Sequence, residues 1–392
     1  MEKQNRFLKG LFRLVSYVLV AAIASAATLY WMPAERTDKL DELRTLIDTC
    51  FIGEADPVLM EDAAADAMVN ALGDRWSYYI PASQYAAYME QMKNAYVGIG
   101  VTIATEPEEE GFKILQVDPS GGAYEAGLLA GDILVAVSGQ NVMETGIDAT
   151  RDLIRGEENT QVEVSVLRDG EMLTVSVPRR TVQVQVANGQ LLEGNIGLVR
   201  IVNFDERCAQ ETLAAVEALL EDGAQSLVFD VRFNPGGYKS ELVKILDYLL
   251  PEGPVFRSMS YTGEESVTNS DANCLDIPMA VLINSESYSA AEFFAAALDE
   301  YDKAVLVGEA TTGKGYFQNT FQLRDGSAVG LSVGKYFTPN GVSLAETGGL
   351  KPEIDVAVDN ETAAAIYAGV CQPQDDPQLQ AAMAALKTAL SR

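Results

Sequence analysis

The chain has 392 residues, of which 48% are hydrophobic, so it can form two or three domains with real cores and is not a disordered protein. It carries 28 Lys and Arg against 57 Asp and Glu, which gives a net charge of −29. Phosphate binding needs a basic surface, so this charge disfavours nucleic acid as a partner. The chain contains no histidine, which excludes a Ser-His-Asp triad, a Cys-His pair and any His-ligated metal site.

The cysteines are widely scattered and show no C-x-x-C spacing, so we expect no metal site and no cofactor. In an exported protein they could form one or two disulfides, or they could be lone buried thiols, and both alternatives stay open. The four residues are Cys50, Cys208, Cys274 and Cys371.

A positively charged N-terminus precedes a mostly apolar run from Leu14 to Met32. About nineteen residues just suffice to span a bilayer, and the positive flank keeps the N-terminus cytoplasmic. Ala24-Ser25-Ala26 has the small-residue character of a cleavage site. Residues 1–35 are therefore predicted to be a signal anchor or a cleaved signal peptide. The protein would be a single-pass membrane protein with an extracytoplasmic catalytic domain, or it would be secreted.

The two segments that follow differ in the spacing of their apolar residues. Residues 36–93 show apolar residues at helical spacing, interrupted at 73–81, and are predicted to be a helical region. Residues 94–179 contain short alternating runs, at 97–101, 113–117, 133–137 and 162–166, which predict a small β domain.

Residues 180–358 read as an α/β core, because strands at 196–201 and 226–231 flank a helix at 206–222. The second of these strands ends in a Gly236-Gly237 turn, which exposes backbone N–H groups. Residues 359–392 form an Ala-rich tail that is predicted to be helical.

The stretch from Val281 to Gln318 carries the candidate chemistry. A short apolar run, a Ser-rich turn and an Ala/Phe/Leu helix place Ser289 near a helix N-terminus, where free N–H groups can bind an oxyanion. Without histidine, a serine nucleophile needs another base, and a desolvated lysine is the recognised substitute. Lys314 lies between two glycines and is the candidate; its pKa would have to fall by roughly 3 units, about 4 kcal/mol. Gln318 is a neutral amide that can orient the amine.

These segments resemble the active-site motifs of the carboxyl-terminal processing proteases, the tail-specific serine endopeptidases of peptidase family S41 with a Ser-Lys dyad. Asn284 to Glu292 is similar to N-x-x-S-A-S-A-S-E, and Gly308 to Gln318 to G-x-x-T-x-G-K-G-x-x-Q. Tyr288 and Ala291 depart from the pattern, and Tyr288 would narrow the pocket beside the nucleophile.

The resemblance implies a role for each matching position. Ser289 would be the nucleophile, Lys314 the general base and Gln318 the residue that positions the lysine, while Glu292 and Thr311 would support them. The family's D-x-R-x-N-P-G-G turn supplies the oxyanion hole. The N–H of Gly237, with Gly236 as the second choice, would therefore act beside that of Ala290.

The β domain resembles a PDZ domain, since Pro119 to Asp132 is similar to P-x-S-P-A-x-x-A-G-L-x-x-G-D. PDZ domains add an extended peptide to a sheet edge and hold its terminal carboxylate with backbone N–H groups. The implied peptide-binding residues are Val97, Gly98, Ile99, Gly100 and Arg155. Arg155 would pair with an acidic group, or it would be a solvated helix-end arginine.

The resemblance implies a multidomain fold of α/β and β parts: an N-terminal membrane segment, a helical region, the PDZ domain and an α/β catalytic core of the ClpP/crotonase type. The implied function is cleavage of exported proteins near their C-termini, with free protein or peptide C-termini as ligands, the membrane as a contact of residues 1–35, and a homo-oligomer or an activating adaptor left open.

Two alternative functions are disfavoured by the sequence. Gly308, Gly313 and Lys314 have the spacing of a P-loop, but Gly315 stands where Ser or Thr must reach Mg²⁺, and a strand rather than a helix follows. The other alternative is a non-catalytic exported PDZ scaffold, against which the joint presence of Ser289, Lys314 and Gln318 argues.

Overall fold

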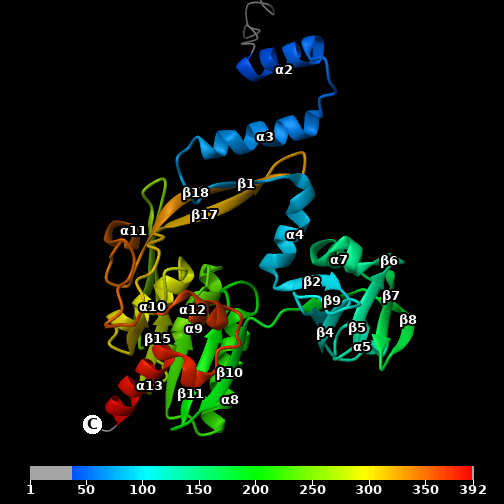
Figure 1. Ribbon diagram of the computed structural model, residues 1–392. Helices are drawn as coiled ribbons and strands as arrows, with labels where there is room; N and C mark the ends of the chain where they lie inside the picture. The colour runs from blue at the N-terminus through cyan, green and yellow to red at the C-terminus, as the bar shows by residue number, and fades with distance from the viewer. Residues whose placement is uncertain (1–37, 391–392) are drawn as a thin grey trace, which may run out of the picture. The chain divides into compact units, whose positions relative to one another are not determined.

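The structure, a computed structural model, describes residues 38–390 (Figure 1). The predicted signal segment, residues 1–35, lies outside them. Within residues 38–390 no helix has both the length and the apolar character needed to cross a bilayer. The chain divides into two units, one ending at Ala67 and the other beginning at Met68.

The first unit contains α2 (Lys39–Cys50) and most of α3 (Pro57–Asn70), as the helical spacing predicted. Neither helix buries a side chain. An exposed ion pair joins them, with 2.6 Å between Arg44 Nη2 and Glu61 Oε1. Exposed pairs contribute little stability, so these helices have no core of their own.

The segment from 73 to 93 is not helical throughout, in agreement with the interruption of helical spacing at 73–81. It holds a strand, β1 (Tyr78–Ile80), before α4 (Ala82–Met92). β1 pairs antiparallel with β18 (Ala328–Phe337), and the ring of Tyr78 covers Gly330, where a Cβ would lie 2.3 Å from the ring. The sheet edge imposes an extended backbone on a segment that lacks helical periodicity.

The β domain is a sheet ordered β3-β4-β5-β7-β8, with β6 on β5, around a core that includes Ile114, Leu134 and Val164. Its elements are β3 (Val101–Ile103), β4 (Phe112–Val117), α5 (Gly122–Glu125), β5 (Ile133–Val137), β6 (Gln140–Asn141), α6 (Val142–Thr145), α7 (Ile147–Ile154), β7 (Gln161–Arg168) and β8 (Glu171–Pro178).

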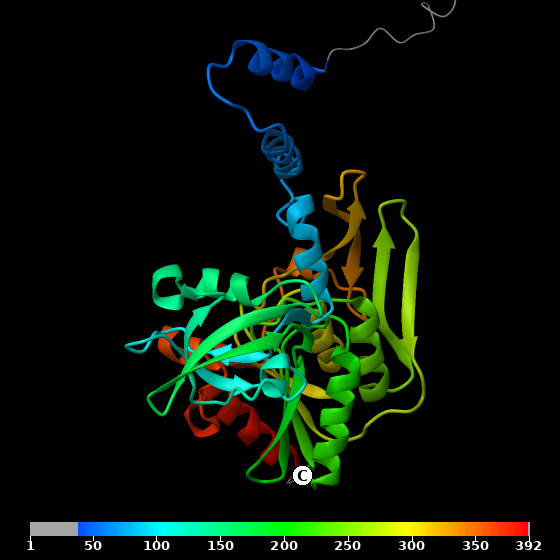
Figure 2. The same ribbon diagram turned by 90° about the vertical axis from the view of Figure 1, so that its right-hand side faces the viewer.

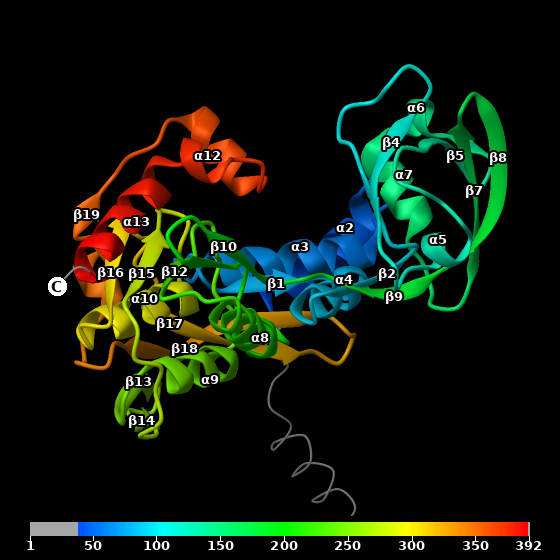
Figure 3. The same cartoon turned by 90° about the horizontal axis from the view of Figure 1, so that it is seen from below.

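The prediction of one strand over 97–101 is wrong. β2 (Ala95–Gly98) ends before Ile99, and the chain turns at Gly100, whose φ is +78°. A Cβ at Gly100 would lie 2.8 Å from the Cα of Gly121, so only glycine fits this turn. β2 pairs instead with β9 (Arg180–Gln183), so the strands that enter and leave this domain lie side by side (Figure 3).

The core sheet has the order β10-β11-β12-β15-β16-β19. β10 is antiparallel to β11 and the remaining pairs are parallel. The strands are β10 (Ala187–Leu192), β11 (Ile196–Ile201), β12 (Ser226–Asp230), β15 (Met279–Ile283), β16 (Ala304–Gly308) and β19 (Ile354–Asp355).

Helices cover both faces of this sheet. α8 (Cys208–Glu221), α9 (Lys239–Leu249) and α10 (Ala290–Glu300) pack on one face, in a cluster that includes Phe229 and Phe294. α13 (Pro377–Leu390) packs on the other face through Leu379, Met383 and Leu386. The remaining short elements are α11 (Leu344–Thr347), α12 (Asn360–Tyr367) and η1 (Pro373–Asp375).

A second sheet adjoins the core and carries β1. β13 (Gly253–Ser260) pairs with β18, so the β13–β14 and β17–β18 hairpins lie side by side (Figure 2). The other strands of this sheet are β14 (Glu265–Ser270) and β17 (Tyr316–Gln322). β17 begins two residues after Lys314, which confirms the strand expected there.

Candidate active site

Ser289 is the N-cap residue of α10, as the sequence predicted. Its φ is 58° and its ψ is −125°, a strained backbone for a non-glycine residue, and the side chain is 7% exposed. β15 delivers the chain to this turn, and the helix that follows is buried along nearly its whole length. The serine is therefore held rigidly at the start of a core helix.

The turn at Gly236 and Gly237 lies directly against Ser289. A Cβ at Gly236 would lie 2.7 Å from the Cβ of Ser289, so the close approach requires glycine. The N–H of Gly236 donates to Asn234 Oδ1 at 2.8 Å. Within residues 38–390, the N–H groups of Gly237 and Ala290 donate to no partner. Of the two glycines proposed from the sequence, only Gly237 has a free donor.

The carboxylate of Glu292 ties the nucleophile turn to the lysine loop. It is fully buried and accepts four hydrogen bonds. The donors are Ser289 N at 3.0 Å, Thr311 Oγ1 at 2.5 Å, Gly313 N at 2.7 Å and Lys314 N at 2.8 Å. Burial raises the pKa of Glu292, although these hydrogen bonds oppose the shift. Glu292 and Thr311 therefore join the two motifs that are 25 residues apart.

The amine of Lys314 lies over the ring of Trp76, with Nζ 4.6 Å from the ring centroid, and 5.9 Å from that of Tyr288. Among the described residues it forms no hydrogen bond or ion pair, so no hydrogen bond joins it to Ser289. Burial lowers the pKa of Lys314 to about 8, against the opposing charges of Asp74 and Glu292. The amine is thus partly deprotonated near neutral pH.

Sequence reasoning did not assign the contact between Trp76 and Lys314. Asp74 fixes the tryptophan turn by accepting from Trp76 N at 3.1 Å and from Ser77 Oγ at 2.6 Å. Ser77 Oγ in turn accepts from Ser332 N at 3.1 Å, which anchors the turn on β18. The break in helical periodicity at 73–81 was the available signal.

Gln318 does not contact the lysine amine in this structure. Its Nε2 donates to Ser332 Oγ at 3.0 Å and to Tyr316 O at 3.2 Å. Gln318 does line the same cavity as Ser289 and Lys314.

That cavity has a volume of about 820 Å³ and brings the candidate groups together. Its walls come from α4, the turn after β11, the glycine turn and β17. Its lining residues include Tyr85, Tyr88, Met92, Asp205, Gly237, Tyr238, Ser289 and Lys314. Tyr288 also lines it, as expected from its place beside the nucleophile.

The predicted peptide site of the β domain lies at its own smaller cavity, of about 260 Å³, lined by Ile99, Gly100 and Arg155. Within the described residues the N–H groups of Ile99 and Gly100 donate to no partner. Val97 and Gly98 belong instead to β2 and pair with β9, and Ile99 is buried in the core.

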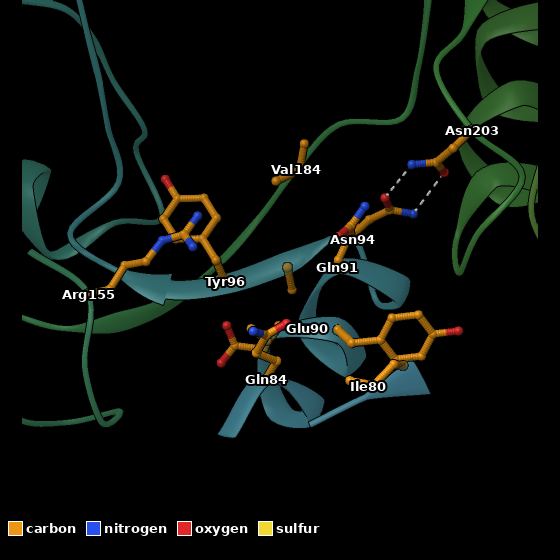
Figure 4. Close-up of a pocket in the computed structure, with 12 residues that line it drawn as sticks. Ile80, Gln84, Glu90, Gln91, Asn94, Tyr96, Arg155, Val184 and Asn203 are labelled. Carbon is orange, nitrogen blue, oxygen red and sulfur yellow. Dashed lines mark hydrogen bonds between the residues drawn. The ribbon is translucent and has the colours of Figure 1, made fainter. Parts of the chain in front are cut away.

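Arg155 lies between this cavity and a second one of about 650 Å³. Its guanidinium lies over the ring of Tyr96, 5.4 Å from the centroid (Figure 4). Across the second cavity, the amides of Asn94 and Asn203 exchange hydrogen bonds of 2.7 and 3.2 Å. Among the described residues, no ion pair joins Arg155 to an acidic group.

None of the four cysteines forms a disulfide, and of the four only Cys208 is buried.

Comparison with known proteins agrees with this arrangement. The model of peptidase family S41 matches residues 195–356, and a PDZ domain model matches residues 113–168. The chain is 29% identical to the "Carboxy-terminal processing protease CtpA" of Bacillus subtilis, over 86% of this chain and 75% of that protein. It is also 29% identical to a "Probable CtpA-like serine protease" of Staphylococcus aureus, over 81% of this chain and 64% of that protein.

A solved structure, "Photosystem II D1 C-terminal processing protease", is 27% identical and covers 87% of this chain and 93% of its own, with a TM-score of 0.49. The matched domains define the class of this protein, a serine-type endopeptidase that carries a PDZ domain. Within that class, residues 195–356 match peptidase family S41, and the Bacillus subtilis relative is named a carboxy-terminal processing protease.

Proposed function

We propose that this protein cleaves exported proteins near their C-termini, with Ser289 as the nucleophile and Lys314 as the general base. The main support is the buried carboxylate of Glu292, which accepts hydrogen bonds from the main-chain N–H groups of both residues. Ser289 and Lys314 also line the same cavity. The lysine there has a lowered pKa, and two free N–H groups lie beside the serine.

In the proposed reaction Lys314 Nζ takes the proton of Ser289 Oγ while that oxygen attacks the scissile carbonyl. The N–H groups of Gly237 and Ala290 stabilise the oxyanion of the tetrahedral intermediate. Lys314 then gives the proton to the leaving amine, and the peptide bond breaks. A water molecule, deprotonated by the same amine, hydrolyses the acyl-enzyme.

Because Lys314 lies over Trp76 rather than on Ser289, its amine must move toward the serine when substrate binds. In apo enzymes catalytic hydrogen bonds are often absent and form only in the complex. Gln318 can support the lysine at that stage, once its side-chain amide leaves Ser332 and forms a hydrogen bond with the amine of Lys314.

The β domain would capture the substrate's C-terminus, with the free N–H groups of Ile99 and Gly100 binding the terminal carboxylate. Residues 1–35 would anchor the protein in the membrane or direct its secretion, so that the substrates are exported proteins. A homo-oligomer or an activating adaptor is compatible with this function.

The test compares the full chain with Ser289→Ala and Lys314→Arg on a loosely folded protein of known C-terminus, with fragments followed by mass spectrometry. Only the wild type should cut, because a guanidinium keeps its charge yet cannot act as a base. Thermal melts of all three proteins control for folding. Cleavage by Lys314→Arg would rule out the base assignment.

A second arm separates the enzyme from a binding scaffold. The substrate is offered with a free and with an amidated C-terminus, which should raise KM if the terminal carboxylate is recognised. If wild type and Ser289→Ala both fail to cut but bind C-terminal peptides equally, the scaffold function is supported instead.

A further inference from the structure

The carboxyl group of Asp205 is buried and unused by the fold. The residue is 5% exposed and follows β11 by four positions. Its Oδ1 has no hydrogen-bond partner, and no ion pair reaches it within the described residues. Buried polar groups nearly always have a partner, so this oxygen requires a reason.

Asp205 is not a cap of the helix that follows. The first N–H groups of α8 are satisfied elsewhere, Cys208 N by the main-chain oxygen of Asp205 at 3.2 Å and Ala209 N by Glu241 Oε2 at 2.9 Å. The main chain of Asp205 is itself fixed, since its N–H donates to Asn203 Oδ1 at 3.0 Å. The main chain of this turn is therefore held by hydrogen bonds, whereas the carboxyl group of Asp205 has an oxygen without a hydrogen-bond partner.

Asp205 lines the catalytic cavity together with Ser289 and Lys314. The preceding residue, Phe204, is paired with the glycine turn: its N–H donates to Gly236 O at 2.7 Å, and its oxygen accepts from Tyr238 N at 2.8 Å. Asp205 is therefore one residue from a backbone bridge to the proposed oxyanion donor Gly237.

The surroundings suit a long cationic side chain. Tyr85, Tyr88, Met92 and Tyr238 line the same cavity, and such walls pack the aliphatic stem of lysine or arginine and attract its charge. Burial, with a smaller effect of the neighbouring Glu206, raises the pKa of Asp205 to about 7. A bound cation would replace the solvent that the carboxylate lacks.

We propose that Asp205 is a specificity-determining residue, which binds the lysine or arginine side chain of a substrate residue close to the scissile bond. The proposal rests on the proposed function, because it takes the cavity beside Ser289 to be the site of peptide cleavage. It adds to that function a substrate preference for basic residues.

The experiment uses the full chain and a peptide series in which lysine replaces the isosteric, uncharged norleucine at each of three positions on either side of the cleaved bond. The enzymes are wild type, Asp205→Asn and Glu206→Gln; the last removes a carboxylate from the adjacent, exposed position. Asparagine keeps the shape of aspartate and removes a buried charge, so the variant should fold, which a thermal melt checks.

At one position wild type should cleave the lysine peptide at least about tenfold better in kcat/KM than the norleucine peptide, as expected for a charged hydrogen bond. Asp205→Asn should lose this preference, and Glu206→Gln should keep it. A preference that is absent in wild type, or that persists in Asp205→Asn, overturns the proposal.

Binding to the Ser289→Ala protein, measured by fluorescence anisotropy with the same peptides, separates the two proposals. Tighter binding of a lysine peptide that disappears in Ser289→Ala/Asp205→Asn supports the role of Asp205 even where wild type does not cut. Cleavage by wild type with no discrimination in either assay leaves the peptidase function standing and rejects the role of Asp205.

Discussion

Two of the buried carboxylates, Glu292 and Asp205, line or support the catalytic cavity and differ in how many hydrogen bonds they accept. Glu292 accepts four hydrogen bonds from the serine turn and the lysine loop. Asp205, in the turn after β11, has a buried oxygen with no partner. Burial raises the pKa of both groups, but only Glu292 has donors that oppose the shift.

The difference shows how a fold separates support from recognition. A carboxylate with all its acceptor sites filled fixes its surroundings and is not available to a ligand. A carboxylate left unpaired beside a cavity is destabilising until a ligand pairs with it. Substitutions at positions that hold the site together should therefore lower the stability and activity of the protein, whereas substitution of Asp205 should raise its stability.

The largest effect is expected for Glu292→Ala. The change leaves the N–H groups of Ser289, Gly313 and Lys314 without their acceptor, so unfolding free energy should fall by about 3–5 kcal/mol. Activity should fall by about 1,000-fold or more, because the serine and the lysine loop lose their common anchor. Urea unfolding and peptide kinetics measure both. A fully active Glu292→Ala would show that the carboxylate is not the link between the two motifs.

The pH dependence of kcat/KM tests whether Glu292 and Asp205 differ in their effect on the pKa of Lys314. With a pKa of about 8, kcat/KM should rise about tenfold per pH unit below 8 and level off above it. Glu292 raises this pKa, so Glu292→Gln should move the midpoint to lower pH. Asp205 is not among the charges that shift it, so Asp205→Asn should keep the wild-type midpoint. A flat wild-type profile between pH 6 and 9 would contradict a lysine base.

A third buried carboxylate, Asp376, should have an intermediate effect. It binds Arg232 through Nη1 at 3.1 Å and Nη2 at 2.7 Å, and so ties the segment before α13 to the residue that opens the glycine turn. Asp376→Asn should cost about 2 kcal/mol, since Asp230 still pairs with the arginine. It should lower kcat more than it raises KM. The exposed neighbour in Asp375→Asn is the control, and equal losses in both variants would refute a role for the buried pair.

The sequence predicted those parts of the site that local pattern controls. A short apolar strand, a serine-rich turn and an alanine-rich helix sufficed to place Ser289 at the start of α10. The glycine turn at Gly237 and the strand after Lys314 were likewise readable, because turns and strand periodicity are local properties.

The parts that failed or were missed depend on contacts between distant segments. A single strand over 97–101 fitted the alternation, but the close packing of Gly100 on Gly121 turns the chain there. β1 is a strand because it joins β18, some 250 residues later in the chain. Trp76 against Lys314, and the unpaired state of Asp205, become visible only when such segments are brought together.

An effect on stability of opposite sign is expected for Asp205→Asn. The folded-state pKa of Asp205 is raised from 3.8 to about 7, so the folded protein binds an extra proton in this range and wild-type stability falls as pH rises through it. Asparagine has no such loss. At pH 8 the variant should therefore be more stable by about 2 kcal/mol, half of what the full shift gives, since solvent in the cavity screens the charge. At pH 4 the two proteins should unfold at nearly the same urea concentration.

The control for this gain is Glu206→Gln, which removes a carboxylate from an exposed position and should change stability by no more than about 0.5 kcal/mol at pH 8. A gain in the unfolding free energy of Asp205→Asn that grows between pH 4 and pH 7 would show that the charged aspartate destabilises the folded protein. If the variant is instead less stable than wild type at pH 8, Asp205 has a partner within the folded chain, and its contrast with Glu292 fails.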